Sequence, residues 1–227
     1  MRPMLHHPRR FAQSGFTLVE MAIVLVIIGL LLGGVLKGQE LIENARVKDV
    51  ANMMNGITAA YNSYIDRYGR LPGDDGPLTG TGNIRARGGS WGVVTDAGDY
   101  DGVVEINMGD TFSTASGENI AFWQHLRAAG FIKGNPADTG ANALPKSPWG
   151  GLVGVTNSNA QGRSQNTLLV CMQNVPGKAA LALDRQLDDA APHTGSVRAT
   201  QGSNANPTSG VIYSYVESQT YTICKDI

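Results

Sequence analysis

The feature that most constrains this chain is a long apolar segment close to its N-terminus. Residues 16–36 carry one charged side chain, that of Glu20. As a helix rising about 1.5 Å per residue, the segment extends roughly 30 Å, the thickness of the hydrocarbon core of a bilayer. A carboxylate inside such a segment costs about 3 kcal/mol on insertion scales. The sequence therefore predicts a membrane-spanning helix in which Glu20 has a partner.

The start of this segment resembles the type III signal of type IV pilins and pseudopilins. Residues 15–20 read Gly-Phe-Thr-Leu-Val-Glu and lead into the apolar run, so the motif covers residues 1 to about 36. In that family a membrane aspartyl peptidase cuts after the glycine and methylates the new N-terminal residue. The resemblance implies cleavage after Gly15 and methylation of Phe16. It also implies that Glu20 neutralises the N-terminal amine of a neighbouring subunit during assembly.

Other interpretations of the segment stay open at this point. A charged side chain near the end of a spanning helix can snorkel to the membrane interface. In that case Glu20 would be tolerated in the helix without having a role in assembly. The segment is also compatible with an uncleaved signal anchor. A secretory signal peptide fits less well, because the charge follows the expected cleavage position and no A-x-A site follows the apolar run.

Charge distribution indicates the orientation and the class of partner. Arg2, Arg9 and Arg10 precede the apolar segment without an acidic neighbour. The positive-inside bias then places the N-terminus in the cytoplasm and the rest of the chain in the periplasm or outside the cell. Removing residues 1–15 lowers Lys plus Arg from 18 to 15 against 19 acidic residues, a net charge of about −4. Such a chain lacks the basic footprint expected of a nucleic-acid-binding protein.

The helix is expected to continue well beyond the membrane. Apolar residues from Val50 to Tyr68 recur at the spacing of one helical face, Gly69 supplies a stop, and Pro72 prevents resumption. The family resemblance implies a ladle-like α+β fold, with this helix packed on a small antiparallel-sheet head. The expected organisation is a leader at 1–15, a transmembrane or filament-core helix at 16–36, an amphipathic half at 37–70 and a globular head at 71–227.

Glycines distinguish this helix from that of many pilins. The family often has a proline near the position of Lys37, whereas this chain has none between Phe16 and Tyr68. Gly29 and Gly33 weaken the helix by up to about 1 kcal/mol each relative to Ala. They provide a place for local melting in a filament or, alternatively, let neighbouring helices approach closely.

The head contains patterns for two helices and several strands. Helices are expected at 116–130 and 177–187, and strands at 151–156 and 167–172. Residues 211–216 and 220–224 are expected to form a closing antiparallel pair. The Gly- and Pro-rich residues 71–92 and the polar residues 192–209 are expected to be loops.

The two cysteines, Cys171 and Cys224, suggest one disulfide. In an oxidising compartment an even pair favours a bond, here closing a loop of about 50 residues. The position of the pair also resembles the C-terminal disulfide of many pilins. Two buried free thiols remain the alternative.

The densest acidic cluster suggests a metal site. Asp96, Asp99, Asp101 and Glu105 surround an Asp-x-Asp-Gly sequence, and alternating carboxylates on a loop suit calcium. The EF-hand pattern itself fails, because Ala97 falls on its first ligand position. A solvated acidic turn is the competing interpretation, so calcium is the only cofactor considered.

Candidate catalytic residues are few. Residues 88–92 match G-x-S-x-G, but a nucleophile elbow needs a strand before Ser90 and a helix after it, and the flanking residues predict neither. His125 lacks ligand spacing, so a surface or packing role is expected. Asp188 and Asp189 are adjacent, so on a helix their side chains point about 100° apart, which favours a cap or a loop anchor. The sequence therefore indicates a protein that is not an enzyme.

The resemblance implies a structural subunit of a type IV pilus-like filament. Its expected partners are prepilin peptidase, other pilin subunits, the inner membrane before assembly, and the pilus or secretion assembly machinery. It is expected as a single-pass inner-membrane precursor with a periplasmic head, and then in an extracellular pilus. A type II secretion pseudopilin, or a minor pilin with an adhesive or DNA-uptake role, are the alternatives.

Overall fold

The computed structural model describes residues 15–227 and divides into two compact units. The N-terminal unit extends to Glu43, and the head unit comprises Asn44–Ile227. Each unit is described by itself below.

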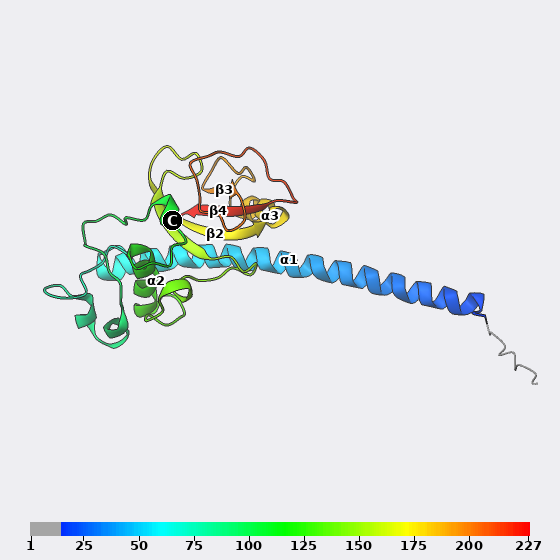
Figure 1. Cartoon of the computed structure of the whole chain (residues 1–227), viewed down its shortest axis with the longest axis horizontal. Helices are drawn as coiled ribbons and strands as arrows, with labels where there is room; N and C mark the ends of the chain where they lie inside the picture. Colours follow the sequence, from blue (N-terminus) through cyan, green and yellow to red (C-terminus); the bar gives the residue numbers. More distant parts are fainter. Residues whose placement is uncertain (1–14) are drawn as a thin grey trace, which may run out of the picture. The chain divides into compact units, whose positions relative to one another are not determined.

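The first helix, α1 (Leu18–Tyr68), is continuous and contributes residues to both units (Figure 1). It ends at Gly69, whose φ of 64° is the left-handed conformation of a helix C-terminus and whose N–H donates to the carbonyl of Ile65 at 2.8 Å. In the head unit one face of α1 is buried at the spacing expected from the sequence. Its buried residues are Val47, Val50, Ala51, Met54, Ile57, Ala60 and Tyr64.

A four-stranded antiparallel sheet forms the other main layer of the head unit. Its strands are β1 (Val153–Ser158), β2 (Thr167–Pro176), β3 (Val197–Gln201) and β4 (Thr220–Asp226), in the order β1-β2-β4-β3. Figure 1 shows β2 and β4 alongside the second half of α1, and Lys225 of β4 lies with its Nζ 3.5 Å from the hydroxyl of Thr58. This combination of a long helix and a small antiparallel sheet confirms the predicted α+β fold class.

Two shorter helices complete the head unit. The helix α2 (Glu118–Ala128) is fully or nearly buried from Asn119 to Arg127, and α3 (Gly177–Leu187) has the bounds expected from the sequence. The segment expected as loop at 71–92 contains two short 3-10 helices, η1 (Ile84–Arg87) and η2 (Gly89–Val93). Two more, η3 (Met108–Asp110) and η4 (Gly140–Asn142), lie in other connections.

The predicted pairing at the C-terminus is wrong. Residues 211–216 form no strand, and β4 instead pairs with β2 and with β3, which lies inside the segment expected to be a loop. The physical reason is burial. Val197 and Ala199 of β3 are completely buried, whereas Tyr213 is 77% exposed. The short segment 197–201, which contains small residues, therefore joins the sheet. The more apolar segment 211–216, which has the clearer alternating pattern, does not.

Candidate processing and assembly site

The residues of the predicted cleavage site lie at the very start of the described chain. Gly15, Phe16 and Thr17 precede α1 in extended or irregular conformation, and the Phe16 side chain is 85% exposed. A Cβ atom at Gly15 would meet nothing within 4 Å. Packing among residues 15–227 therefore does not require glycine at this position, which is compatible with recognition by another molecule.

Thr17 and Glu20 form a reciprocal cap on the first turn of α1. The Glu20 carboxylate accepts hydrogen bonds from the N–H and the hydroxyl of Thr17, each at 2.7 Å, and the Glu20 N–H donates to the Thr17 hydroxyl oxygen at 3.2 Å. This is the capping-box arrangement of Thr-x-x-Glu, in which two otherwise unpaired backbone donors are satisfied. Glu20 thus has a partner within its own chain.

The cap uses one of the two carboxylate oxygens. Both bonds from Thr17 go to Oε2 of Glu20, and within residues 15–227 no donor lies at hydrogen-bond distance from Oε1. A carboxylate at a helix N-terminus is favoured by the helix dipole, which holds the negative charge at the start of α1. The arrangement leaves Oε1 without a donor among residues 15–227.

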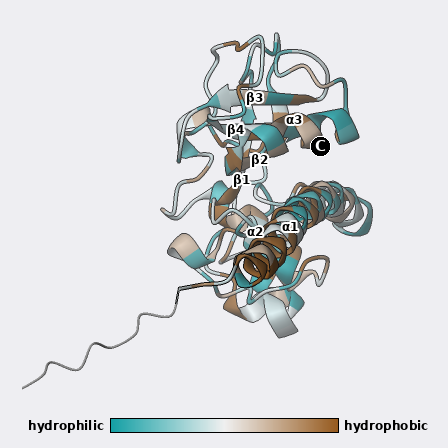
Figure 2. Ribbon diagram, turned by 90° about the vertical axis from the view of Figure 1, so that its right-hand side faces the viewer, coloured by the Kyte–Doolittle hydropathy of each residue, from teal (hydrophilic) through white to brown (hydrophobic). Residues whose placement is uncertain are grey.

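The following apolar residues are exposed. From Leu18 to Leu36 the large apolar side chains have exposed fractions of 46% or more, and Figure 2 shows the hydrophobic colour over this part of α1. Among the helices of residues 15–227, α1 alone is long and apolar enough to cross a membrane. An exposed apolar surface of this length needs lipid or other protein around it.

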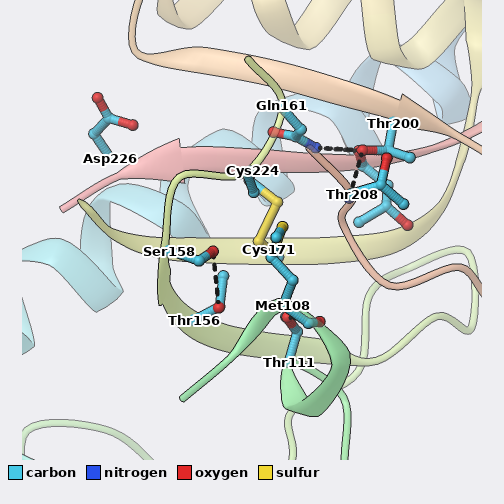
Figure 3. Close-up of a disulfide and its surroundings, with 12 residues drawn as sticks. Met108, Thr111, Thr156, Ser158, Gln161, Cys171, Thr200, Thr208, Cys224 and Asp226 are labelled. Carbon is cyan, nitrogen blue, oxygen red and sulfur yellow. Dashed lines mark hydrogen bonds between the residues drawn. A yellow bond between two sulfur atoms is a disulfide. The ribbon is translucent and has the colours of Figure 1, made fainter. Parts of the chain in front are cut away.

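The predicted disulfide is present in the head unit. Cys171 of β2 and Cys224 of β4 are directly opposite each other in the sheet, both completely buried, and their sulfur atoms are bonded (Figure 3). The bond lies at the centre of the sheet and closes the segment that contains α3 and β3. It therefore links the two ends of a segment whose residues 202–219 form no helix or strand.

The structure separates the four residues predicted to bind calcium. Asp96 is buried and accepts hydrogen bonds from the Thr95 hydroxyl and from the N–H of Gly117, so it anchors the start of α2. Asp99 and Asp101 instead come together with Asp74, with carboxylate oxygens within 4.8 Å of one another.

Glu105 does not join this group of carboxylates. It is exposed, and its N–H donates to the carboxylate of Glu118. A calcium site in this region stays a prediction.

Asp74 and Glu118 are the acidic residues here that sequence reasoning missed. Asp74 is 1% exposed and accepts from the N–H groups of Asp101 and Gly102, while burial raises its pKa. Burial, aided by the negative charges of Asp74, Glu105 and Asp99, raises the pKa of Glu118 to about 7. The only sequence signal was their acidity, because both are remote in sequence from the cluster they join.

The candidate catalytic residues have structural surroundings. His125 is completely buried, accepts from the N–H of Gly73 at 3.1 Å, and stacks on Tyr64. Burial lowers the pKa of its imidazole to about 4, so it is neutral at physiological pH. The predicted packing role is therefore confirmed. Ser90 lies in the 3-10 helix η2 and is preceded by another 3-10 helix, so the context of a nucleophile elbow is missing.

Asp188 and Asp189 anchor the loop that follows α3, as predicted. Asp188 accepts from the N–H of Val197 at 2.9 Å, and Asp189 accepts from the N–H of Ala191 and the hydroxyl of Thr194. With Asp184 they form a second group of converging carboxylates. Each of these bonds of Asp188 and Asp189 goes to a backbone or hydroxyl group of the chain itself, which is the chemistry of a loop anchor.

Comparison with known protein families gives a match at the N-terminus of the chain. Residues 10–36 match the prokaryotic N-terminal methylation motif, which is the signature of type IV pilins and pseudopilins. No curated protein and no solved structure matches the chain significantly. The motif points to a structural subunit and does not distinguish a pilus subunit from a pseudopilin or a minor pilin.

Proposed function

We propose that this chain, which carries the type IV pilin and pseudopilin signature, is a structural subunit of a type IV pilus-like filament. The observation that carries the proposal is the match at residues 10–36 on a helix whose apolar side chains are exposed. The precursor spans the inner membrane through α1 with its head in the periplasm. Prepilin peptidase cuts after Gly15 and methylates Phe16, and the subunit then leaves the membrane for the filament.

Assembly depends on the carboxylate at the start of α1. Cleavage creates an amine on Phe16 of each subunit, and a buried amine and a buried carboxylate are each costly when unpaired. The Oε1 atom of Glu20, which accepts nothing from the described chain, receives the amine of a neighbouring subunit. The Thr17 contacts hold the same carboxylate in place through Oε2. During assembly the apolar side chains of α1 lose their contacts with lipid and gain contacts with the helices of neighbouring subunits.

A pseudopilin and a minor pilin would share this N-terminus. They differ from a major pilus subunit in the compartment that the filament reaches or in the number of copies that it contains. A type II secretion pseudopilin makes a short periplasmic structure, and a minor pilin enters the filament in few copies. Electron microscopy of the cell surface with an antibody to the head separates the three. Label along whole fibres indicates a major subunit, label at tips a minor one, and label confined to the periplasm a pseudopilin.

The proposal is tested by the yield of sheared filaments from cells that express the chain with its peptidase and assembly machinery. The wild type should give filaments, and Glu20→Ala should give few or none because the neighbour's amine loses its acceptor. Thr17→Ala is the matched control, since it removes both hydroxyl contacts of the cap but keeps the carboxylate. It should retain most filaments, with a loss of about 1 kcal/mol in helix capping. Equal yields from Glu20→Ala and the wild type would refute the assembly role.

A further inference from the structure

An apolar groove opens on the head unit between α1 and the segment that follows α2. It has a volume of about 620 Å³. Residues of the second half of α1 form one wall, and Trp123 of α2 with residues that follow α2 form the other. Its apolar lining comprises Met53, Ile57, Trp123, Phe131, Ile132 and Pro145. A groove of this size and composition suits a pair of aliphatic side chains from a partner.

Two side chains of α2, at or next to this second wall, have buried donors without a hydrogen-bond partner. Trp123 and Arg127 are four residues apart on α2, so they share a face. The Nε1 atom of Trp123 and the Nε and Nη1 atoms of Arg127 are buried without a hydrogen-bond partner. The nearest carboxylate to Arg127, that of Asp138, lies 4.0 Å away. The guanidinium charge beneath this wall is therefore poorly neutralised.

The chain passes directly over that guanidinium. A Cβ atom at Gly134 would lie 2.5 Å from Nε of Arg127, so only glycine permits this approach. The adjacent Lys133 is exposed at the groove and, among residues 15–227, has no ion-pair partner. Asp49 on the α1 wall is the acidic member of the lining. Lys133, next in sequence to the glycine that lies against Arg127, makes this wall attractive to a carboxylate.

A complementary segment lies elsewhere on α1. Beyond Leu36 and before the first buried residue of the head, Val47, the large apolar residues are Leu41 and Ile42. They are 60% and 56% exposed, and they lie outside both the 21-residue apolar segment and the head core. Carboxylates flank this pair on both sides, since Glu40 precedes it and Glu43 follows it. Residues 38–46 thus combine an exposed apolar pair with two carboxylates and one arginine, Arg46, and Glu40 already pairs with Lys37 at 2.8 Å.

We propose that the groove receives residues 38–46 of a second copy of this chain. Leu41 and Ile42 enter the apolar lining, and Glu43 pairs with Lys133. The copy must be a second one, because residues 38–46 and the α1 wall belong to one continuous helix and the segment cannot fold back on its own groove. The inference rests on the proposed function, in which copies of the chain come together, and names the contact between them.

The test is a site-specific photocrosslink in the full-length chain, in membranes and in sheared filaments. The photoreactive residue p-benzoylphenylalanine replaces Asn52, which is exposed at the rim of the groove. Illumination should produce an adduct of twice the subunit mass, and trypsin should release it joined to residues 38–46 of the other copy. An adduct with lipid, with another protein or with another segment would overturn the proposal, as would the absence of any dimer.

Charge reversals test the recognition itself. Lys133→Glu and Glu43→Lys should each lower the adduct yield about two- to fivefold, the range for one exposed ion pair. The two changes combined should restore it, and Lys178→Glu on α3 should leave it unchanged. Failure of the combined variant to restore the yield would contradict the pairing. Filament yield, scored separately, tests the proposed function: filaments without the crosslink overturn only the groove contact, and the crosslink without filaments counts only against the pilus role.

Discussion

The hydroxyl of Tyr64 on α1 donates a hydrogen bond of 2.5 Å to the buried carboxylate of Asp75. The same carboxylate accepts from Arg87 at 2.8 Å and, more weakly, from Arg70 at 3.3 Å. Burial and the nearby Asp75 raise the pKa of the Tyr64 hydroxyl, which therefore remains a donor at physiological pH. Asp75 thus ties the end of α1 to the irregular segment that follows it.

Removing this carboxylate should destabilise the head strongly. Asp75→Ala leaves the partly buried Arg87 without its partner, and breaking one side of such a pair costs about 3 kcal/mol or more. Tyr64→Phe removes one hydrogen bond and should cost about 1–2 kcal/mol. The free energy of unfolding of the full-length protein in detergent, measured with urea and tryptophan fluorescence, tests both. Arg70→Ala, which leaves the Tyr64 and Arg87 contacts of Asp75 in place but also removes a bond to the Gly76 carbonyl and a contact with the Tyr100 ring, is the comparison. A smaller cost for Asp75→Ala than for Arg70→Ala would contradict this role of Asp75.

The disulfide should make a large contribution to the stability of the head. It joins residues 53 positions apart, and the loop-entropy estimate gives roughly 4 kcal/mol for a loop of that length. The double variant Cys171→Ala with Cys224→Ala should therefore unfold at a much lower urea concentration than the wild type. If the two proteins unfold at the same concentration, the bond has no such role.

The head should lose stability between acidic and neutral pH through Glu118. Its pKa is raised from 4.5 to about 7 in the folded state, mainly by burial. A carboxyl of this kind contributes stability that is fully present below pH 4.5 and is lost as the pH rises through about 7. Glu118→Gln keeps an acceptor for the Glu105 N–H without the titration. Melting temperatures between pH 5 and 8 should fall for the wild type and change less for Glu118→Gln; parallel curves would exclude this explanation.

Gly29 and Gly33 of the apolar helix should affect contacts between subunits and not the fold of the single chain. Cβ atoms at Gly29 and Gly33 would meet nothing within 4 Å in the described chain. Leucine there should even favour the isolated helix, by up to about 1 kcal/mol each. We expect Gly29→Leu and Gly33→Leu to leave processing intact and to lower filament yield, because close helix approach is lost. Leu32→Ile is the control on the same helix, and undiminished yield from both glycine variants would show that they are not contact points.

Elements with a strong period could be predicted from the sequence, and those that depend on distant partners could not. The long helix and α3 follow from apolar spacing and from glycine stops, which are local signals. β3 was missed because five residues between polar turns carry little pattern. These residues form a strand because they pair with β4, and Val197 and Ala199 become completely buried there. Residues 211–216 have the better alternation but no partner strand.

The same distinction applies to the functional residues. Gly15, Phe16 and Glu20 are candidates because the signal for them is a short contiguous motif. Thr17 belongs to the same motif, and Thr-x-x-Glu before an apolar run is also the pattern of the capping box that the structure shows. Asp74 comes close to Asp99 and Asp101 only because of the path that the loops take. In the same way, Gly134 lies against the buried guanidinium of Arg127 only because the chain turns back over α2. Such placements depend on packing across long sequence separations.

Processing after Gly15 is tested by the intact mass of the protein extracted from membranes that contain its peptidase. We expect a chain that begins at Phe16, with residues 1–15 removed and one methyl group added to the new amine. Gly15→Val, whose side chain the described chain itself can accommodate, should remain at full length and unmethylated. A wild-type protein that keeps its full mass, or one cut at another position regardless of Gly15, would contradict the account.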